Sequence, residues 1–508
     1  MLRKVRVVAA AIFFSLITLL FLDFTGTLHG VFAWMAKLQF VPALLALNFG
    51  VVLFLILMTL LFGRIYCSVI CPMGVMQDIF GWLGKRAKKN RYSYSPQKRV
   101  LRVVVLILFV LATVAGVGAV TVLLEPYSAY GRIASTLFAP LYKLGNNLLA
   151  YFAERADSYA FYRVDVMIKS VAAMAVAAVT LVVLGILAWR GGRTYCNTIC
   201  PVGTILGFLS KFSWFKPVID TTKCNGCTLC ARNCKASCID SKEHKIDYTR
   251  CVACMDCISK CNRGAISYAH IKNGAKGAAG EKLSGEGNDG VKGRREFLAA
   301  TAVLATSVVA KAQEDKVDGG LAVILDKKAP KRTTRIVPPG ALGIAHLEQH
   351  CTGCQLCVSV CPNNVLRPSS DLGSFMQPYS SYENGYCRPE CTRCSDVCPA
   401  GAIKAVSVED KSSIQIGHAV WVKKNCLPVT GGVSCGKCSK VCPVGAIQMV
   451  KVSCKDCTDK CDGVTRKCKQ IPVVDAERCI GCGACENMCP SRPFSAIYVE
   501  GHSEHKFV

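Results

Sequence analysis

Cysteine spacing constrains this chain more than any other feature. The chain has 508 residues and 33 cysteines, and all of the cysteines except Cys238 fall into short runs. In the most regular runs, three cysteines are separated by two residues each and a fourth follows after three more; these runs begin at Cys224, Cys251, Cys351 and Cys479. This spacing is typical of ferredoxins with two 4Fe–4S clusters, in which the fourth cysteine binds the neighbouring cluster. A chain with so many such runs is expected to carry single electrons.

The first two runs predict a two-cluster ferredoxin domain over residues 204–271. If the fourth cysteines cross, one cluster is bound by Cys224, Cys227, Cys230 and Cys261, and the other by Cys251, Cys254, Cys257 and Cys234. Zinc is the alternative, because all-cysteine zinc sites also use cysteines separated by two residues. The close repetition of a four-cysteine run favours clusters over zinc.

Residues 340–508 predict a larger polyferredoxin domain with four more sets. Two of these sets contain insertions: Cys387, Cys391, Cys394 and Cys398 form one, and Cys426, Cys435, Cys438 and Cys442 form the other. A nested arrangement would pair the first run with the last, so that Cys351, Cys354 and Cys357 join Cys489, and Cys479, Cys482 and Cys485 join Cys361. The inner runs would then place Cys387, Cys391 and Cys394 with Cys442, and Cys426, Cys435 and Cys438 with Cys398.

A further group of cysteines lies outside this pattern and consists of Cys454, Cys457, Cys461 and Cys468. These residues could bind another cluster or zinc, or they could form two disulfides in an oxidising periplasm. Cys238 is either a buried spare thiol or a reactive one. The sequence does not decide between these alternatives.

Four apolar runs predict membrane helices at Val7–Leu22, Val41–Phe62, Val103–Leu124 and Val171–Trp189. A helix needs about 20 apolar residues to cross a bilayer, so the first run is slightly short. The alternative for that run is a signal peptide, but no cleavage motif follows it. The expected fold class is a multi-domain membrane protein, with a four-helix transmembrane unit over residues 1–203 and α+β ferredoxin-like 4Fe–4S domains after it.

Positive charge is distributed unevenly between the connections of these runs. Lysine and arginine are concentrated before the first run, between the second and third, and after the fourth. The positive-inside rule therefore places both ends of the four-helix unit in the cytoplasm. This asymmetry explains much of the formal net charge of +27, so we do not expect binding to nucleic acid.

A repeated motif follows the second and fourth apolar runs. Residues 63–74 and 192–203 are identical at eight of twelve positions, which indicates two helix pairs related as a repeat. Each copy carries a Cys-x3-Cys-Pro sequence, and we call the resulting four cysteines, Cys67, Cys71, Cys196 and Cys200, the quartet. The quartet could bind a 4Fe–4S cluster, form redox-active disulfides or hold a soft metal such as copper. We prefer a shared redox site near the cytoplasmic face.

Residues 272–312 join the two ferredoxin regions. Residues 272–293 contain few large apolar side chains and predict a flexible linker. Residues 294–312 begin with Arg294 and Arg295, continue into a short apolar stretch and end at Ala310-Lys311-Ala312, as in a twin-arginine export signal. The alternative is a chance arginine pair before an apolar linker. Because the twin-arginine route carries folded proteins, the signal predicts that residues 340–508 are periplasmic.

The motifs resemble two known families joined end to end. The two Gly-Arg-x-Tyr-Cys-x3-Cys-Pro motifs, the four apolar runs and the following ferredoxin are similar to the NapH-type membrane iron–sulfur subunit, and to NosR-type and CcoG-type membrane ferredoxins. Residues 294–500 resemble the exported NapG-type polyferredoxin. The resemblance implies transfer of electrons from menaquinol toward a periplasmic reductase. The fusion and the group Cys454–Cys468 depart from the NapH and NapG pattern.

Together these features predict an electron-transfer component of a quinol-dehydrogenase-type oxidoreductase in a bacterial inner membrane. It would pass electrons from menaquinol, or a cytoplasmic donor, through at least six 4Fe–4S clusters and as many as eight. The alternative is an assembly or reactivation factor that supplies electrons for the maturation of a metalloenzyme. The sequence has no nucleotide-binding fingerprint. His29, Glu125 and Asp165 are candidate proton acceptors for a quinol, although each is more often an ordinary polar residue.

Overall fold

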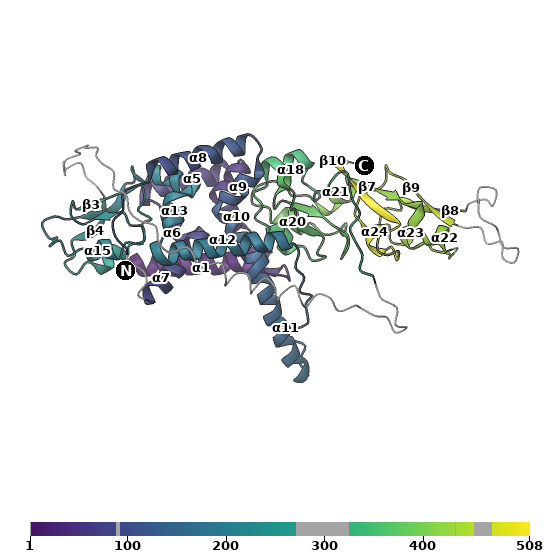
Figure 1. Ribbon diagram of the computed structural model, residues 1–508, viewed down its shortest axis with the longest axis horizontal. Helices are drawn as coiled ribbons and strands as arrows, with labels where there is room; N and C mark the ends of the chain where they lie inside the picture. The colour runs from purple at the N-terminus through teal and green to yellow at the C-terminus, as the bar shows by residue number, and fades with distance from the viewer. Residues whose placement is uncertain (1, 88–91, 271–324, 432, 452–469, 508) are drawn as a thin grey trace, which may run out of the picture.

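The computed structural model describes residues 2–87, 92–270, 325–431, 433–451 and 470–507. These residues form an elongated molecule with a helical unit in the middle and a small α+β unit at each end (Figure 1). The predicted linker 272–293, the twin-arginine segment 294–312 and the group Cys454–Cys468 lie outside the described residues.

The helical unit takes up the first part of the chain. Its elements are α1 (Leu2–Leu22), α2 (Thr27–Phe32), α3 (Trp34–Lys37), α4 (Phe40–Leu45), α5 (Phe49–Phe62), α6 (Ile65–Val69), α7 (Pro72–Arg86), α8 (Arg99–Val114), α9 (Gly118–Leu124), α10 (Pro126–Ile133), the π-helix η1 (Ala134–Phe138), α11 (Ala139–Arg155), α12 (Val171–Gly191), α13 (Thr194–Thr198) and α14 (Pro201–Ser210). Helices α1, α5, α8 and α12 run along the long axis of the molecule, whereas α11 projects away from it (Figure 1).

Two of the four predicted membrane helices are interrupted. The second apolar run is divided into α4 and α5 at Leu47, whose φ is 53°, and Asn48 then caps α5 by accepting a hydrogen bond from the Val51 amide at 3.3 Å. The third run is divided into α8 and α9 at Gly116, whose φ of 73° suits glycine. Within the described part of the chain, only α1 and α12 are long and apolar enough to cross a membrane. The prediction of a four-helix transmembrane unit is therefore not supported by the described residues.

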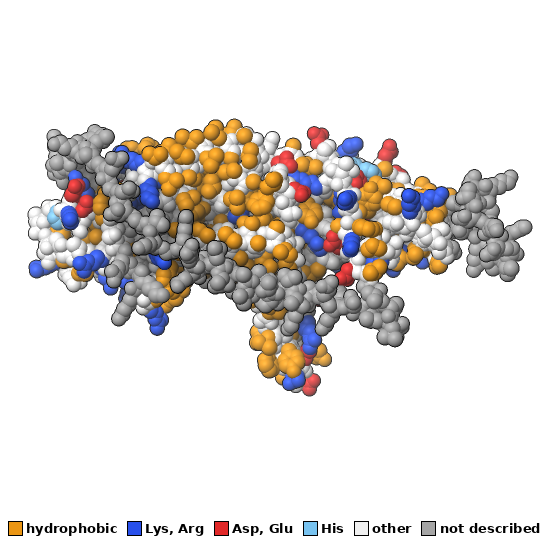
Figure 2. Space-filling model, viewed as in Figure 1, with side chains coloured by type: hydrophobic (Ala, Val, Ile, Leu, Met, Phe, Trp, Pro, Cys, Tyr) orange, Lys and Arg blue, Asp and Glu red, His pale blue; other side chains and the backbone are white. Residues whose placement is uncertain are grey.

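Apolar side chains cover much of the outer surface of the helical unit. Val100, Val114 and Val179 are 79%, 83% and 63% exposed, and Figure 2 shows a broad apolar area over the middle of the molecule. Helix α11 also exposes an apolar stripe, formed by Leu141, Leu144, Leu148 and Phe152. Exposed apolar areas of this extent indicate contact with a partner or a membrane.

The N-terminal ferredoxin unit packs against one end of the helical unit. Its elements are β1 (Phe215–Ile219), α15 (Leu229–Arg232), β2 (Ile239–Asp240), β3 (Lys245–Ile246), α16 (Asp256–Lys260) and β4 (Ile266–His270). Strand β1 pairs antiparallel with β4, and β2 pairs with β3. These short antiparallel strand pairs hold together the two segments of the ferredoxin unit that carry the cysteine runs.

The C-terminal ferredoxin unit is larger. It contains α18 (Ile344–His350), α19 (Leu356–Val360), β5 (Leu366–Pro368), the 3₁₀-helix η2 (Leu372–Ser374), β6 (Pro378–Ser380), α20 (Arg393–Asp396), α21 (Val408–Ser413), β7 (Ile414–Trp421), the 3₁₀-helix η3 (Lys423–Asn425), α22 (Leu427–Thr430), α23 (Lys437–Lys440), β8 (Ile447–Lys451), β9 (Gln470–Val474), α24 (Ala484–Met488) and β10 (Ile497–Phe507). Strands β7 and β10, β8 and β9, and β5 and β6 form antiparallel pairs.

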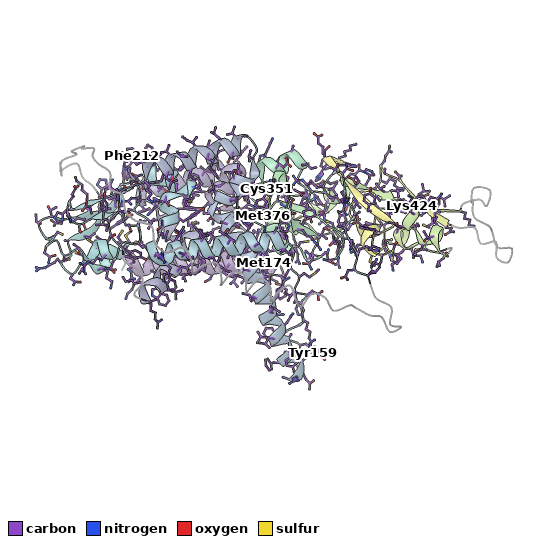
Figure 3. All side chains as sticks on the ribbon, in the orientation of Figure 1. Tyr159, Met174, Phe212, Cys351, Met376 and Lys424 are labelled. Carbon is purple, nitrogen blue, oxygen red and sulfur yellow. The ribbon has the colours of Figure 1, made fainter. Side chains whose placement is uncertain are left out.

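This C-terminal unit packs against the other end of the helical unit. Met376 is buried against Val122 of α9 and Ala173 of α12, where the helical unit meets the C-terminal unit (Figure 3). Ser135 of η1 donates a hydrogen bond to the side chain of Gln355 at 3.0 Å. The two ferredoxin units therefore lie at opposite ends of the helices (Figure 1).

Candidate metal centres

The structure brings the four cysteines of the quartet together in the core of the helical unit. Cys67 lies on α6 and Cys196 on α13, while Cys71 and Cys200 precede the prolines that begin α7 and α14. Proline is favoured at the first position of a helix, so each Cys-Pro sequence starts a new helix just behind a thiol. All four side chains are buried, and their thiols interact with one another electrostatically.

The arginines of the repeated motif reach across from one copy to the other. Arg64 donates hydrogen bonds to the Cys196 carbonyl at 3.2 Å and the Asn197 side chain at 3.0 Å, and its Nη2 lies 3.7 Å from the sulfur of Cys67. Arg193 donates to the carbonyl of Cys67. Both side chains are fully buried. Two guanidinium groups thus stabilise negative charge on the quartet.

The last glycine of each motif copy makes room for these arginines. A Cβ atom at Gly74 would collide with the carbonyl of Cys67, and one at Gly203 would collide with the carbonyl of Cys196. The same added atoms would lie within about 3 Å of a guanidinium from the other copy. The glycines at the ends of the two copies are therefore required first by the cysteine carbonyl of their own copy and then by the arginine of the other copy.

Polar side chains of α7 complete the surroundings of the quartet. Gln77 donates a hydrogen bond to the sulfur of Cys196 at 3.1 Å. Asp78 pairs with Arg193 at 2.7 Å and with Lys235 of the N-terminal ferredoxin unit at 2.7 Å. Burial alone would raise the pKa of Asp78, but the charges of Arg193 and Lys235 outweigh it and hold the pKa well below its ordinary value. Asp78 is therefore ionised and links the quartet to the ferredoxin unit.

The N-terminal ferredoxin unit groups its cysteines as the crossing rule predicts. Cys224, Cys227, Cys230 and Cys261 line one cavity of about 200 Å³. In the second set, the thiol of Cys257 interacts with those of Cys254, Cys251 and Cys234. Each set thus combines three cysteines of one run with the fourth of the other.

Cys238, the residue outside every run, lies at the second of these sets. Its sulfur is 3.5 Å from that of Cys234, and its thiol also interacts with that of Cys251. Cys238 is almost fully buried. Spacing did not indicate a role for Cys238, because this residue lies outside every run and meets Cys234 through a turn.

The C-terminal ferredoxin unit pairs its runs in a different order from the nested prediction. Cys351, Cys354 and Cys357 lie with Cys398 and not Cys489, and Cys387, Cys391 and Cys394 lie with Cys361 and not Cys442. Cys426, Cys435 and Cys438 lie with Cys489, and Cys479, Cys482 and Cys485 lie with Cys442. The first two runs and the last two runs therefore form separate pairs, because each pair shares its own hydrophobic core.

The cysteine sets follow one another through the molecule. The backbone amide of Cys387 donates to the carbonyl of Cys482 at 2.9 Å, which joins the two pairs of the C-terminal unit. Tyr127, at the start of α10, is fully buried and interacts with Cys354. One continuous hydrophobic core includes Cys234, the quartet, Tyr127 and Cys354. This core joins the quartet to a set on either side, and buried charged residues such as Arg64 and Arg193 lie beside it.

The environment of these thiols suits metal-bound thiolates. Backbone amides donate to the sulfurs of Cys351, Cys398, Cys442 and Cys489 at 3.2–3.4 Å. Burial raises the pKa of Cys351 to about 12, so the free thiol is neutral and metal must displace its proton. The repeated sets of four cysteines suit 4Fe–4S clusters. Such clusters supply one-electron oxidation and reduction.

The three candidate proton acceptors do not form a common site. The His29 ring pairs with Asp23 at 3.0 Å, and Glu125 is buried as the cap of α10, accepting from the Ser128 amide. Asp165 is exposed. His29 and Glu125 have structural roles and Asp165 faces solvent, as expected of ordinary polar residues.

Comparisons with known proteins agree with this chemistry. A family described as a 4Fe-4S binding domain matches residues 44–91 and 171–220, which contain both copies of the repeated motif. A second family with the same description matches residues 346–367 and 472–495. These matches and the cysteine sets define a 4Fe–4S protein of ferredoxin-type electron transfer.

The similar proteins identify the family more closely. The methylamine utilization ferredoxin-type protein MauM of Methylophilus methylotrophus is 32% identical over 182 residues, which cover 33% of this chain and 71% of that protein. The ferredoxin-type protein NapG of Escherichia coli is 30% identical over 217 residues, or 39% of this chain and 81% of that protein. The Escherichia coli ferredoxin-type protein NapF is 25% identical over 194 residues, or 37% and 99%. The chain belongs to the family of ferredoxin-type 4Fe–4S proteins that includes MauM and NapG. No solved structure matches it.

Proposed function

We propose that the protein carries single electrons from menaquinol, or a cytoplasmic donor, across a bacterial inner membrane to a periplasmic reductase. The observation that carries this proposal is the row of cysteine sets. The row begins in the N-terminal ferredoxin unit, passes through the quartet and continues through the junction at Cys354 into the C-terminal unit. We assign six 4Fe–4S clusters to the ferredoxin-type sets and a seventh to the quartet.

Several features support a membrane location for the helical unit. Helices α1 and α12 have the length and composition to span a bilayer, and the helical surface between the two ferredoxin units is apolar (Figure 2). Helix α11 runs across the long axis with its apolar stripe exposed, as expected of a helix that lies at a membrane surface (Figure 1). In this arrangement the N-terminal unit is cytoplasmic and the C-terminal unit periplasmic. The helical unit and first ferredoxin would correspond to a NapH-type subunit, and the C-terminal part to a NapG-type subunit.

The test is reduction of the C-terminal clusters by menaquinol in proteoliposomes that contain the full chain. Paramagnetic resonance should detect reduction in the wild type and at least tenfold slower reduction when Cys67→Ser and Cys196→Ser are combined. Dithionite should still reduce the C-terminal clusters of this variant. If menaquinol reduction survives while a client metalloenzyme loses its metal in cells, the protein is instead a maturation factor. The burial of the quartet disfavours that alternative, because a client could not reach its thiols.

The proposed topology has a separate test. A reporter fused after Val508 should be active in the periplasm, since the C-terminal unit packs at the end of the helices opposite the N-terminal unit (Figure 1). A reporter after His270 in a truncated chain should be active in the cytoplasm. A cytoplasmic signal from the first fusion would contradict transfer across the membrane.

A further inference from the structure

A cleft of about 610 Å³ lies between α1 and α7, where the helical unit meets the N-terminal ferredoxin unit. This volume falls within the roughly 300–1,000 Å³ that is usual for small-molecule sites. One wall is apolar and is formed by Val7, Ala11, Phe14, Ile79 and Trp82. The opposite end is charged and is formed by Arg3, Arg6, Asp78, Lys235 and Asp256. The cleft therefore suits a molecule with a polar head and an apolar tail.

The cleft borders two of the cysteine sets. Gln77 lines it and also donates a hydrogen bond to the sulfur of Cys196 in the quartet at 3.1 Å. Asp256 lines it from the other side and interacts with Cys254 of the second ferredoxin set. A molecule in the cleft would lie beside two redox centres at once, which is the position expected of an electron donor or acceptor.

The charged end of the cleft combines ion pairs with further lysines. Arg3 pairs with Asp256 at 2.8 Å, Arg6 pairs with Asp78 at 3.1 Å, and Lys235 contacts both carboxylates at 3.1 and 2.7 Å. Lys85, which donates a hydrogen bond to Asn233, and Lys260 also line the cleft, so cations outnumber carboxylates there. These donors suit the oxygen atoms of a polar head group. Because two cysteine sets border the cleft, the favoured head group is one that exchanges electrons.

We propose that the cleft binds an isoprenoid quinol, with its ring between Gln77 and Asp256 and its tail along the apolar wall. This inference rests on the proposed function and adds the position at which the quinol is oxidised. Each quinol loses two electrons and two protons. The two flanking cysteine sets would hold the clusters that accept these electrons one at a time, and the protons would leave to water at the charged end. The cleft lies along the N-terminal part of α1, whereas Asp23 and His29 follow the C-terminal end of this helix.

The test compares two substitutions on the exposed surface of α1. Ala11→Phe fills the cleft, whereas Val8→Phe adds a similar side chain where α1 does not line it. The full chain is placed in nanodiscs and titrated with the quinol analogue 2-heptyl-4-hydroxyquinoline N-oxide, and binding is followed by the quenching of tryptophan fluorescence. Trp82→Phe should remove most of the quenching because Trp82 lines the cleft. Ala11→Phe should weaken binding at least tenfold, and Val8→Phe less than twofold.

Several results would overturn the inference. Equal affinity in the wild type and Ala11→Phe would place the analogue elsewhere, and so would an equal loss in Val8→Phe. A phospholipid that stays bound in native mass spectrometry and is not displaced by the analogue would make the cleft a lipid site. Dithionite-reduced spectra of each variant show whether its clusters are intact. If the analogue binds as expected but menaquinol never reduces the wild-type clusters, the proposed function fails and the quinone site stands.

Discussion

The quartet and the C-terminal ferredoxin sets hold the same ligand atoms by different means. In the C-terminal unit, sulfurs such as those of Cys398 and Cys442 accept hydrogen bonds from backbone amides four or five residues away. In the quartet, Cys200 also accepts from a backbone amide, that of Gly203 at 3.3 Å, but the buried guanidinium groups of Arg64 and Arg193 add positive charge, and each donates to a carbonyl of the other copy. The ferredoxin sets thus rest on local loops, and the quartet on local loops together with side chains that meet across the fold.

This difference predicts different responses to substitution. A backbone amide cannot be removed by changing a side chain, so a ferredoxin set should tolerate most changes near it. A buried guanidinium can be removed, and the groups that it contacts are then left without partners. The quartet should therefore be the more fragile site, although it is the more deeply buried.

Replacement of Arg193 by methionine should have the largest effect. The change removes a buried cation that pairs with Asp78 at 2.7 Å and leaves the carbonyl of Cys67 without a donor. Loss of one partner of a buried pair costs about 3–5 kcal/mol. We expect loss of the quartet cluster with retention of the others, measured as iron per chain and as the disappearance of one paramagnetic signal.

Two controls accompany this prediction. Arg190→Met removes an exposed arginine three residues earlier and should leave the iron content unchanged. Arg193→Lys keeps the charge but loses the forked geometry, so it should retain part of the cluster. If Arg193→Met keeps the full iron content and every signal, the buried arginines do not stabilise the quartet.

The second prediction concerns the pairing of runs in the C-terminal unit. Cys398→Ser and Cys354→Ser should perturb the same cluster, because these thiols lie in one set. Cys489→Ser should perturb a different cluster, together with Cys426→Ser. Mössbauer and paramagnetic resonance spectra of the single variants would show which signals change together. A common change in Cys354→Ser and Cys489→Ser would restore the nested arrangement.

The sequence predicted some of this organisation and failed on the rest for physical reasons. Crossing of Cys234 and Cys261 followed from two adjacent runs, since a short connection leaves few alternatives. The nested pairing in the C-terminal unit was wrong because spacing identifies ligands but does not show which loops share a core. The interruption of the third apolar run depends on one backbone angle at Gly116, which hydropathy does not detect.

The surroundings of the quartet could have been found from the repeat itself. Arg64 and Arg193 occupy the same position in the two copies, as do Gly74 and Gly203. An arginine repeated three residues before a cysteine is a signal of charge compensation at that cysteine. The contacts of Gln77 and Lys235 carry no such signal, because the first depends on the packing of α7 against α13 and the second on the packing of the ferredoxin unit against α7.

The smallest predicted effect concerns a ferredoxin set that a side chain does influence. If Cys234 binds a cluster as a thiolate, the thiol of Cys238 is the donor in their 3.5 Å contact. Hydrogen bonds to cluster sulfurs raise the reduction potential, and a bond worth about 0.5–1.5 kcal/mol corresponds to roughly 20–60 mV for one electron. Cys238→Ala should lower the potential of that cluster by this amount, whereas Cys238→Ser keeps a donor and should shift it less. Redox titration followed by paramagnetic resonance measures both values. An unchanged potential in Cys238→Ala would mean that backbone amides alone set the potential of this set, and that tuning by side chains is confined to the quartet.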